Sequence, residues 1–337
     1  MAKRAKKRSG RRTNRRRERR LVIVLLALLV MLASMLYMIR YEGTRRMVLR
    51  RNAKYSALYT APSIGPTETI APTAPADSPA PAAVEPTPAA TAVPTPSPAP
   101  TATIEIAVDQ TREPLATPDA DTVVIAMETP PPVQESFNAL LAANPETVGF
   151  LTIEDILTLP VVQRANDNEF YLSHAFDLEE DPGGTLFLDG SNLLVPEDDC
   201  LIIYGHNMRN GTMFQQLVNY EDPSFMKENA LIRFDTLYEN RVYVPFAALT
   251  VTAEPDSDRY LNLRQFALDS SGFNRFVQSL RALSEWESPV EAAYGDHVLL
   301  LVTCEYTRDN GRFVLALRAL RDDETPEQLL SQAQQAK

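Results

Sequence analysis

Two residues whose side chains could take part in a reaction, Cys304 and His206, each follow an apolar run that is typical of a buried strand. The run 298–302 leads to Cys304, and the run 201–204 leads through Gly205 to His206. Because glycine permits a sharp turn, Gly205 is expected to expose the histidine at the strand end. A cysteine with a histidine is the minimum set for thiol acyl-transfer chemistry. The chain has only 2 cysteines and 3 histidines from which such a pair can come.

An arginine completes the candidate site. Asn310-Gly311 is a tight-turn signal, so a hairpin is expected to bring Arg312 back beside Cys304. A guanidinium held there could donate hydrogen bonds to an oxyanion or to substrate carbonyls. Arg308 is the alternative, but it lies on the expected loop, where a solvated charge is the usual outcome.

The remaining cysteine and histidines fit structural roles better. Cys200 begins the strand that leads to His206, so roughly 20 Å of extended chain separates the two residues. A Cys200–Cys304 disulfide is therefore the weaker alternative to a free thiol at Cys304. His174 follows no strand end, and His297 opens the strand far from its cysteine. These residues show no metal-ligand spacing, and no cofactor is implied.

The N-terminus has the pattern of a membrane anchor. Residues 1–20 carry twelve Lys or Arg, and residues 21–39 carry no charge. The uncharged run would rise roughly 28 Å as a helix, which is longer than the apolar region of a cleaved signal peptide. The more basic side stays cytoplasmic, which predicts an exported remainder. The juxtamembrane segment 40–60 adds six basic residues that could lie against anionic headgroups.

Composition then changes twice. Residues 61–132 hold seventeen of the 26 prolines, which predicts a disordered stalk, with or without O-glycans, that carries the last domain away from the membrane. Residues 61–337 have a net charge of −27, which argues against nucleic acid as a partner of the exported part. The basic tail 1–20 could bind RNA in principle, but a role in topology and lipid contact is the simpler interpretation.

A catalytic domain is expected at 133–322, because short apolar runs punctuated by Gly, Pro, Asn and Asp predict a mainly β barrel or sandwich. The expected strands are 149–153, 158–162, 184–188, 200–204, 230–234, 242–252, 297–303 and 312–319. Pro245 predicts an edge or a bulge in its strand. The last residues, 323–337, are predicted to form a polar, frayed tail.

Helices are expected at three places. Residues 133–144 show helical spacing, and Thr212 could cap a short helix. Ser270 or Ser271 could cap a longer helix at 272–284, just before the cysteine strand. The apolar stripe of this helix is expected to face the core rather than a partner.

Together these motifs resemble the sortases, the cysteine transpeptidases of Gram-positive cell walls. Tyr-Gly-His-Asn-Met at 204–208 resembles the histidine motif, Val-Thr-Cys-Glu-Tyr at 302–306 the Thr-Cys motif, and Gly311-Arg312 the arginine position. The long helix before the cysteine strand resembles a class B feature. The segments 159–163, 167–172 and 184–189 look like the N-terminal strands of class B.

The resemblance implies a closed barrel of about eight strands, with an N-terminal helix and a helix inserted before the cysteine strand. It implies that Cys304 attacks a sorting motif of the Leu-Pro-x-Thr-Gly or Asn-Pro-x-Thr-Asn kind. His206 would transfer protons and Arg312 would stabilise the oxyanion. Thr303 would help to orient the site, with Asn207 and Glu305 beside it. The partners would be surface proteins that carry such signals and an amine of a peptidoglycan precursor or a pilin.

Two other functions stay open at this point. A thiol protease that releases its product to water would use the same residues, because only the nucleophile that resolves the intermediate differs. A non-catalytic, wall-spanning binding module with a decayed site is the second, although the presence of all three motif residues argues against it.

Overall fold

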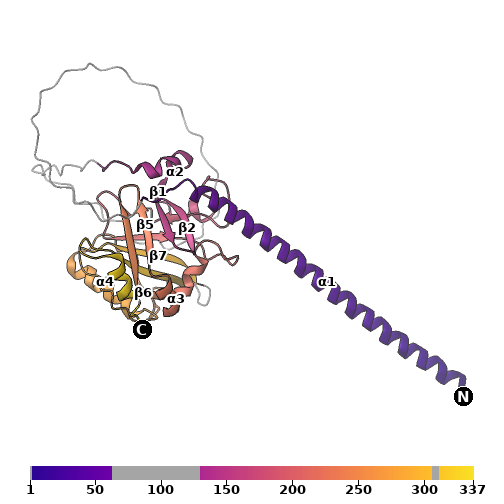
Figure 1. Ribbon diagram of the computed structural model, residues 1–337. Helices are drawn as coiled ribbons and strands as arrows, with labels where there is room; N and C mark the ends of the chain where they lie inside the picture. The colour runs from indigo at the N-terminus through magenta and orange to yellow at the C-terminus, as the bar shows by residue number, and fades with distance from the viewer. Residues whose placement is uncertain (1, 63–129, 306–310) are drawn as a thin grey trace, which may run out of the picture. The chain divides into compact units, whose positions relative to one another are not determined.

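The computed structural model describes residues 2–62, 130–305 and 311–337 (Figure 1). Residues 1–62 and 128–337 belong to one compact unit. Residues 63–129, which include most of the predicted stalk, lie outside the described residues. So do Arg308 and the Asn310 of the predicted turn. Cys304 and Glu305 are described by their backbone only.

Eight strands close into a barrel in the order β1-β2-β3-β4-β7-β8-β6-β5. Each predicted strand is present, with ends that shift by a few residues at most, so the prediction of a closed, mainly β barrel is confirmed. The strands are β1 (Thr147–Ile153), β2 (Leu157–Val162), β3 (Leu186–Leu188), β4 (Cys200–Tyr204), β5 (Ile232–Thr236), β6 (Asn240–Thr252), β7 (Val298–Glu305) and β8 (Gly311–Ala319).

The centre of the barrel is built around β7. This strand pairs parallel with β4 and antiparallel with β8. Its residues Leu299, Leu300 and Leu301 have no exposed surface, so neither face of the strand meets water. An uninterrupted apolar run is the pattern expected of a strand that is covered on both faces. On the far side of β8, the pairing with β6 shifts register between Pro245 and Ala247, which confirms the predicted bulge.

Short helices fill the connections: η1 (Glu135–Phe137), α2 (Asn138–Ala143), η2 (Phe170–Leu172), η3 (Phe214–Glu221) and α3 (Pro223–Glu228). The long helix before β7 is α4 (Ser270–Ala282), and its buried stripe faces the core as predicted. The predicted cap of α4 is wrong, because the Asp269 side chain, not a serine, accepts the hydrogen bond from Gly272 N. The Thr212 cap is also wrong, because η3 has Met213 at its N-cap without a side-chain bond.

The C-terminal residues are ordered, which corrects the prediction of a frayed tail. Helix α5 (Pro326–Ala333) begins with a capping box between Thr325 and Gln328. Its side chains Leu329 and Ala333 are buried in the main core. Beyond it, the backbone of Lys337 exchanges two hydrogen bonds of 2.9 Å with Glu287. The polar composition misled because two small or apolar residues on one helix face are enough to seat a short helix.

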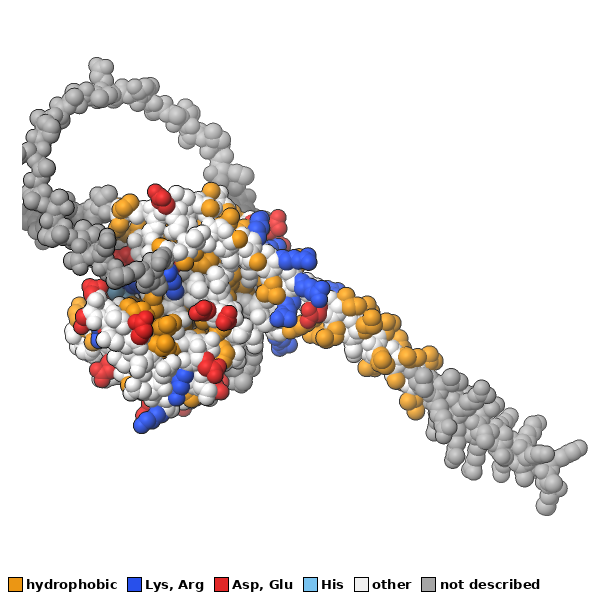
Figure 2. Space-filling view, viewed as in Figure 1, with side chains coloured by type: hydrophobic (Ala, Val, Ile, Leu, Met, Phe, Trp, Pro, Cys, Tyr) orange, Lys and Arg blue, Asp and Glu red, His pale blue; other side chains and the backbone are white. Residues whose placement is uncertain are grey.

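One helix, α1 (Ala2–Ser56), covers the basic tail, the uncharged run and most of the juxtamembrane segment. Within the described residues, its stretch Leu25–Ser56 is long and apolar enough to cross a membrane. Figure 2 shows hydrophobic side chains covering part of α1, followed by a group of Lys and Arg side chains. The helix is therefore a candidate membrane anchor or signal sequence.

Candidate active site

The register of β4 against β7 brings His206 and Cys304 to the same end of the barrel. Tyr204 pairs with Val302 in the parallel ladder. Gly205 N extends the ladder by donating to Val302 O at 3.1 Å. His206 and Cys304 each come two residues after the Tyr204–Val302 pair, on strands about 4.8 Å apart. The backbones of the predicted base and nucleophile are therefore neighbours.

The register of β7 against β8 brings in the arginine. Cys304 lies directly opposite Arg312 in the antiparallel ladder. Opposed residues in such a ladder have Cα atoms about 4.5–5.5 Å apart. The Arg312 side chain is half-buried, and its Nη1 donates to Gly311 O at 3.0 Å. The three predicted site residues thus meet at the end of three adjacent strands, β4, β7 and β8.

His206 is oriented by a backbone carbonyl. Its Nε2 lies 2.7 Å from Leu172 O. A carbonyl oxygen can only accept, so the imidazole carries a proton on Nε2. This contact fixes both the tautomer and the direction of the ring. Leu172 ends η2, so a connection outside the barrel sets the protonation pattern of the candidate base.

Gly205 is required for this placement. A Cβ at this position would lie 2.4 Å from Leu186 Cδ2 and 2.7 Å from Phe214 Cδ2. A side chain at this position would therefore force Leu186 or Phe214 to move. The following loop is closed by a bond of 2.9 Å from Phe214 N to His206 O and by a bridge between Asn207 and Met213. The histidine is held at the base of a short, closed loop.

The three supporting residues have different surroundings. Thr303 is 2% exposed, and its Oγ1 has no hydrogen-bond partner within the described part of the chain. Asn207 takes part in the bridge that closes the loop after His206. Glu305 lies opposite Gly311 at the end of the ladder. Their orienting roles stay predictions.

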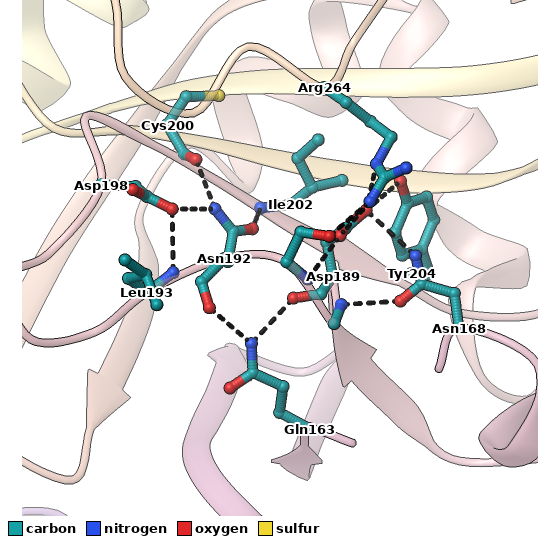
Figure 3. Close-up of polar contacts among 12 residues, drawn as sticks. Gln163, Asn168, Asp189, Asn192, Leu193, Asp198, Cys200, Ile202, Tyr204 and Arg264 are labelled. Carbon is teal, nitrogen blue, oxygen red and sulfur yellow. Dashed lines mark hydrogen bonds and ion pairs between the residues drawn. The ribbon is translucent and has the colours of Figure 1, made fainter. Parts of the chain in front are cut away.

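A polar network that sequence reasoning missed lies beside β4 (Figure 3). The fully buried carboxylate of Asp189 accepts from Arg264 Nε at 3.1 Å and Nη2 at 3.0 Å. It also accepts from Tyr204 OH and from Asn168 Nδ2, each at 3.1 Å. These contacts join the end of β3, strand β4 and the segment before α4. The network therefore fixes the strand residue that precedes Gly205 and His206.

A second group in the same view ties the β3–β4 connection to β4. Asn192 Nδ2 donates to Asp198 Oδ2 at 3.0 Å and to Cys200 O at 2.8 Å. Its Oδ1 accepts from Ile202 N at 2.9 Å. One buried amide thus bonds two backbone groups on the same edge of β4, the edge opposite β7, before the strand reaches the site.

The rejected candidates lie apart from this end. Cys200 is a free, buried cysteine beside Val298, at the opposite end of the β4–β7 ladder from Cys304. Burial, followed by the nearby negative charges of Asp198 and Asp199, raises the pKa of Cys200 well above its usual range. The ladder therefore excludes a Cys200–Cys304 disulfide, as predicted.

The two other histidines have local partners. His174 stacks on Phe170 with ring centroids 3.9 Å apart, and His297 Nδ1 lies 3.2 Å from Glu197 Oε1. Among the described residues, no group of three or more His, Cys, Asp or Glu side chains could hold a metal ion.

Comparison of the sequence with known proteins also points to a cysteine enzyme. No family model matches the chain. It is 30% identical over 202 residues to the sortase B of Listeria monocytogenes, covering 59% of this chain and 78% of the relative. It is 28% identical over 192 residues to the sortase B of Staphylococcus aureus, covering 56% and 76%.

A solved structure agrees. The Staphylococcus aureus sortase B–substrate complex superposes with a TM-score of 0.51 at 27% identity, covering 56% of this chain and 87% of that one. A closed eight-stranded barrel that gathers a cysteine, a histidine and an arginine at one end thus coincides with clear sequence similarity over most of a known enzyme. The chain belongs to the sortase B family of cysteine transpeptidases.

Proposed function

We propose that Cys304, His206 and Arg312 are the catalytic residues and that they join a sorting peptide to an amine at the cell surface. The observation that carries this proposal is the convergence of two ladder registers, Tyr204 with Val302 and Cys304 with Arg312, at one end of the barrel. Backbone pairing fixes each register, so the backbones of the three residues lie near one another at that end.

The first half of the reaction forms a thioester. The thiolate of Cys304 attacks the carbonyl carbon of the scissile peptide, and the carbonyl oxygen becomes an oxyanion beside Arg312. The C–N bond then breaks as His206, which holds the proton taken from the Cys304 thiol, protonates the departing amine. The acyl group stays on sulfur, and the C-terminal part of the substrate leaves.

The second half transfers the acyl group. An incoming amine loses a proton to His206 and attacks the thioester carbonyl, with the charge again beside Arg312. The C–S bond breaks, an amide forms and the thiolate is regenerated. The imidazole thus returns to its starting protonation state after each cycle.

The resemblance to sortases favours a pentapeptide of the Asn-Pro-x-Thr-Asn or Leu-Pro-x-Thr-Gly kind as donor. The acceptor would be the amine of a peptidoglycan precursor or a pilin. The excess of basic residues before the apolar run favours a cytoplasmic N-terminus and an extracellular barrel. In that orientation the enzyme meets exported proteins as they leave the membrane.

The test uses the full chain in detergent micelles with peptides of both kinds, with and without an amine acceptor, and mass analysis of the products. A thioacyl adduct on Cys304 and an amide product are expected. Cys304→Ala should form neither product, and Cys304→Ser is the milder control. An amide product from Cys304→Ala would disprove the assignment. Free acid alone, even at high amine concentration, would favour the hydrolase instead.

A further inference from the structure

The helix that follows the apolar run is docked on the barrel. Val48, Tyr55 and Tyr59 are buried although basic residues surround them in sequence. The Tyr55 ring lies 4.8 Å from that of Phe176, and the Tyr59 ring stacks on Phe150 at 4.1 Å. Residues 48, 52 and 55 recur at helical spacing within α1, so they form one face directed at the barrel, and Tyr59 follows in the turn after the helix.

Polar contacts strengthen this face. Tyr55 OH donates to Asp177 Oδ2 at 2.7 Å, and Arg51 Nη1 pairs with Asp181 Oδ2 at 2.5 Å. Tyr59 OH donates to Asp235 Oδ2 at 2.7 Å, and that carboxylate is completely buried. Arg233 Nε on the same strand also donates to Asp235, so Tyr59 supplies one of its donors, and the loss of a donor to a buried carboxylate would be costly. The contacts therefore favour a docked helix.

The two ends of the proline-rich segment are fixed on the same strand. Before it, Pro62 O accepts from Arg233 Nη1 at 3.1 Å. After it, Gln134 Nε2 donates to Thr236 O at 2.8 Å. Arg233 and Thr236 are three residues apart on β5, or roughly 10 Å. A segment that leaves and returns at such close points adds no distance between the anchor and the barrel.

The docked helix also contacts two segments connected to His206. On one side, Asp177 and Asp181 belong to the connection that follows Leu172, whose carbonyl orients the imidazole. On the other side, Tyr41 OH donates to Arg209 O at 3.0 Å in the loop that His206 begins. In the same loop, Asn52 Nδ2 lies 3.9 Å from Met213 Sδ.

Tyr41 is also close to the membrane anchor. It comes two residues after the uncharged run ends at residue 39, or about 3 Å along the helix axis. The loop that His206 begins therefore lies near the level where the helix leaves the apolar layer.

From these contacts we propose that the last part of α1, residues 41–56, and the turn up to Tyr59 dock on the barrel, hold its active end at the membrane surface and position His206. Residues 63–129 are then an insertion in the barrel unit rather than the spacer expected from their composition. The inference rests on the proposed function only for its catalytic consequence. It places the scissile peptide of a membrane-held substrate close to the bilayer.

The proposed distance between the barrel and the lipid surface is tested by deleting residues 66–125 from the full chain in lipid nanodiscs. The residues that remain can extend by roughly 35 Å, enough to rejoin the two fixed ends. A donor dye on Tyr294→Cys, in a Cys304→Ser background, reports energy transfer to a dye at the lipid surface. Equal transfer with and without the deletion is expected. Higher transfer after the deletion would identify a spacer and overturn the proposal.

The positioning role is tested with Arg51→Glu, and the exposed neighbour Arg50→Glu is the matched control. In Arg51→Glu, kcat should fall about tenfold while KM stays unchanged, because the segments that support the histidine are loosened. Amide hydrogen exchange at 173–185 and 207–213 should rise in this variant only. Unchanged exchange would overturn the proposal. Hydrogen exchange and energy transfer can be measured without catalysis. The docking proposal and the proposed transpeptidase function can therefore be disproved independently.

Discussion

Cys304 and Arg312 are placed in one way, and His206 in another. The cysteine and the arginine lie opposite each other within a ladder whose neighbours are almost all apolar and buried. The histidine lies just beyond a strand, and its ring depends on a carbonyl from a distant connection. A site can thus have one half fixed by backbone pairing and another half fixed by contacts around it. The two halves should respond differently to mutation.

The largest effect is expected at Arg312, which lies opposite Cys304 in the β7–β8 ladder. Arg312→Ala should lower kcat by about 10²–10³, because one donor to the oxyanion is lost. Its thermal stability should stay near that of the wild type, because the backbone pairing persists. Arg308→Ala is the matched control and should keep full activity. Loss of activity in Arg308→Ala with retention in Arg312→Ala would exchange the two assignments.

The next effect probes the polar support of β4. Asp189→Ala leaves Arg264, Tyr204 and Asn168 without their shared acceptor, so unfolding free energy should fall by about 3–5 kcal/mol. Urea unfolding of the barrel would measure it. Asp189→Asn keeps part of the hydrogen bonding and should cost less. Equal losses in the two variants would show that volume, rather than the charged network, supports the strand.

Gly205→Ala tests the histidine half directly. The new methyl group would meet Leu186 and Phe214 at distances far below contact, which should cost about 1–3 kcal/mol and shift His206. Labelling of Cys304 by a thiol reagent would show whether the cysteine half is unchanged while kcat falls. Gly43→Ala, where an added Cβ meets nothing within 4 Å, is the control. A variant with normal kcat would mean that the histidine tolerates the displacement.

The difference between the halves also explains what the sequence could predict. The strands were predictable because apolar runs end at Gly, Pro, Asn or Asp, and the Cys304–Arg312 pair followed from a short hairpin. The partner of His206 was not predictable, because a backbone carbonyl such as that of Leu172 leaves no signal in residue type. The Asp189–Arg264 pair joins positions 75 residues apart. Periodicity cannot indicate such a contact, since each side chain alone resembles a solvated charge.

Lowering the pH should weaken the contacts of Glu146 with Arg164 and Tyr171, next to Leu172, before it affects the β7–β8 ladder. Hydrogen bonds from Arg164 hold the pKa of Glu146 below its usual range, with a further bond from Tyr171 OH at 2.5 Å. Because the folded-state pKa is depressed, this contribution is present above the unfolded pKa, near 4.3, and is lost as the pH falls through the lower folded value. The stability gap between wild type and Glu146→Gln should shrink below about pH 4. A gap independent of pH would contradict this assignment.

The smallest effect concerns the helix before the cysteine strand, where the sequence suggested the wrong cap. Asp269→Ala removes the acceptor for Gly272 N, whereas Ser270→Ala and Ser271→Ala leave that bond in place. The melting temperature should fall by about 3 °C in the aspartate variant and hardly change in the serine variants. The Gly272 bond also lowers the pKa of Asp269, so the difference should fade in acid. Since α4 packs mainly on β6, kcat should be unchanged in all three variants. A loss of activity in Asp269→Ala would mean that the start of α4 also positions the site.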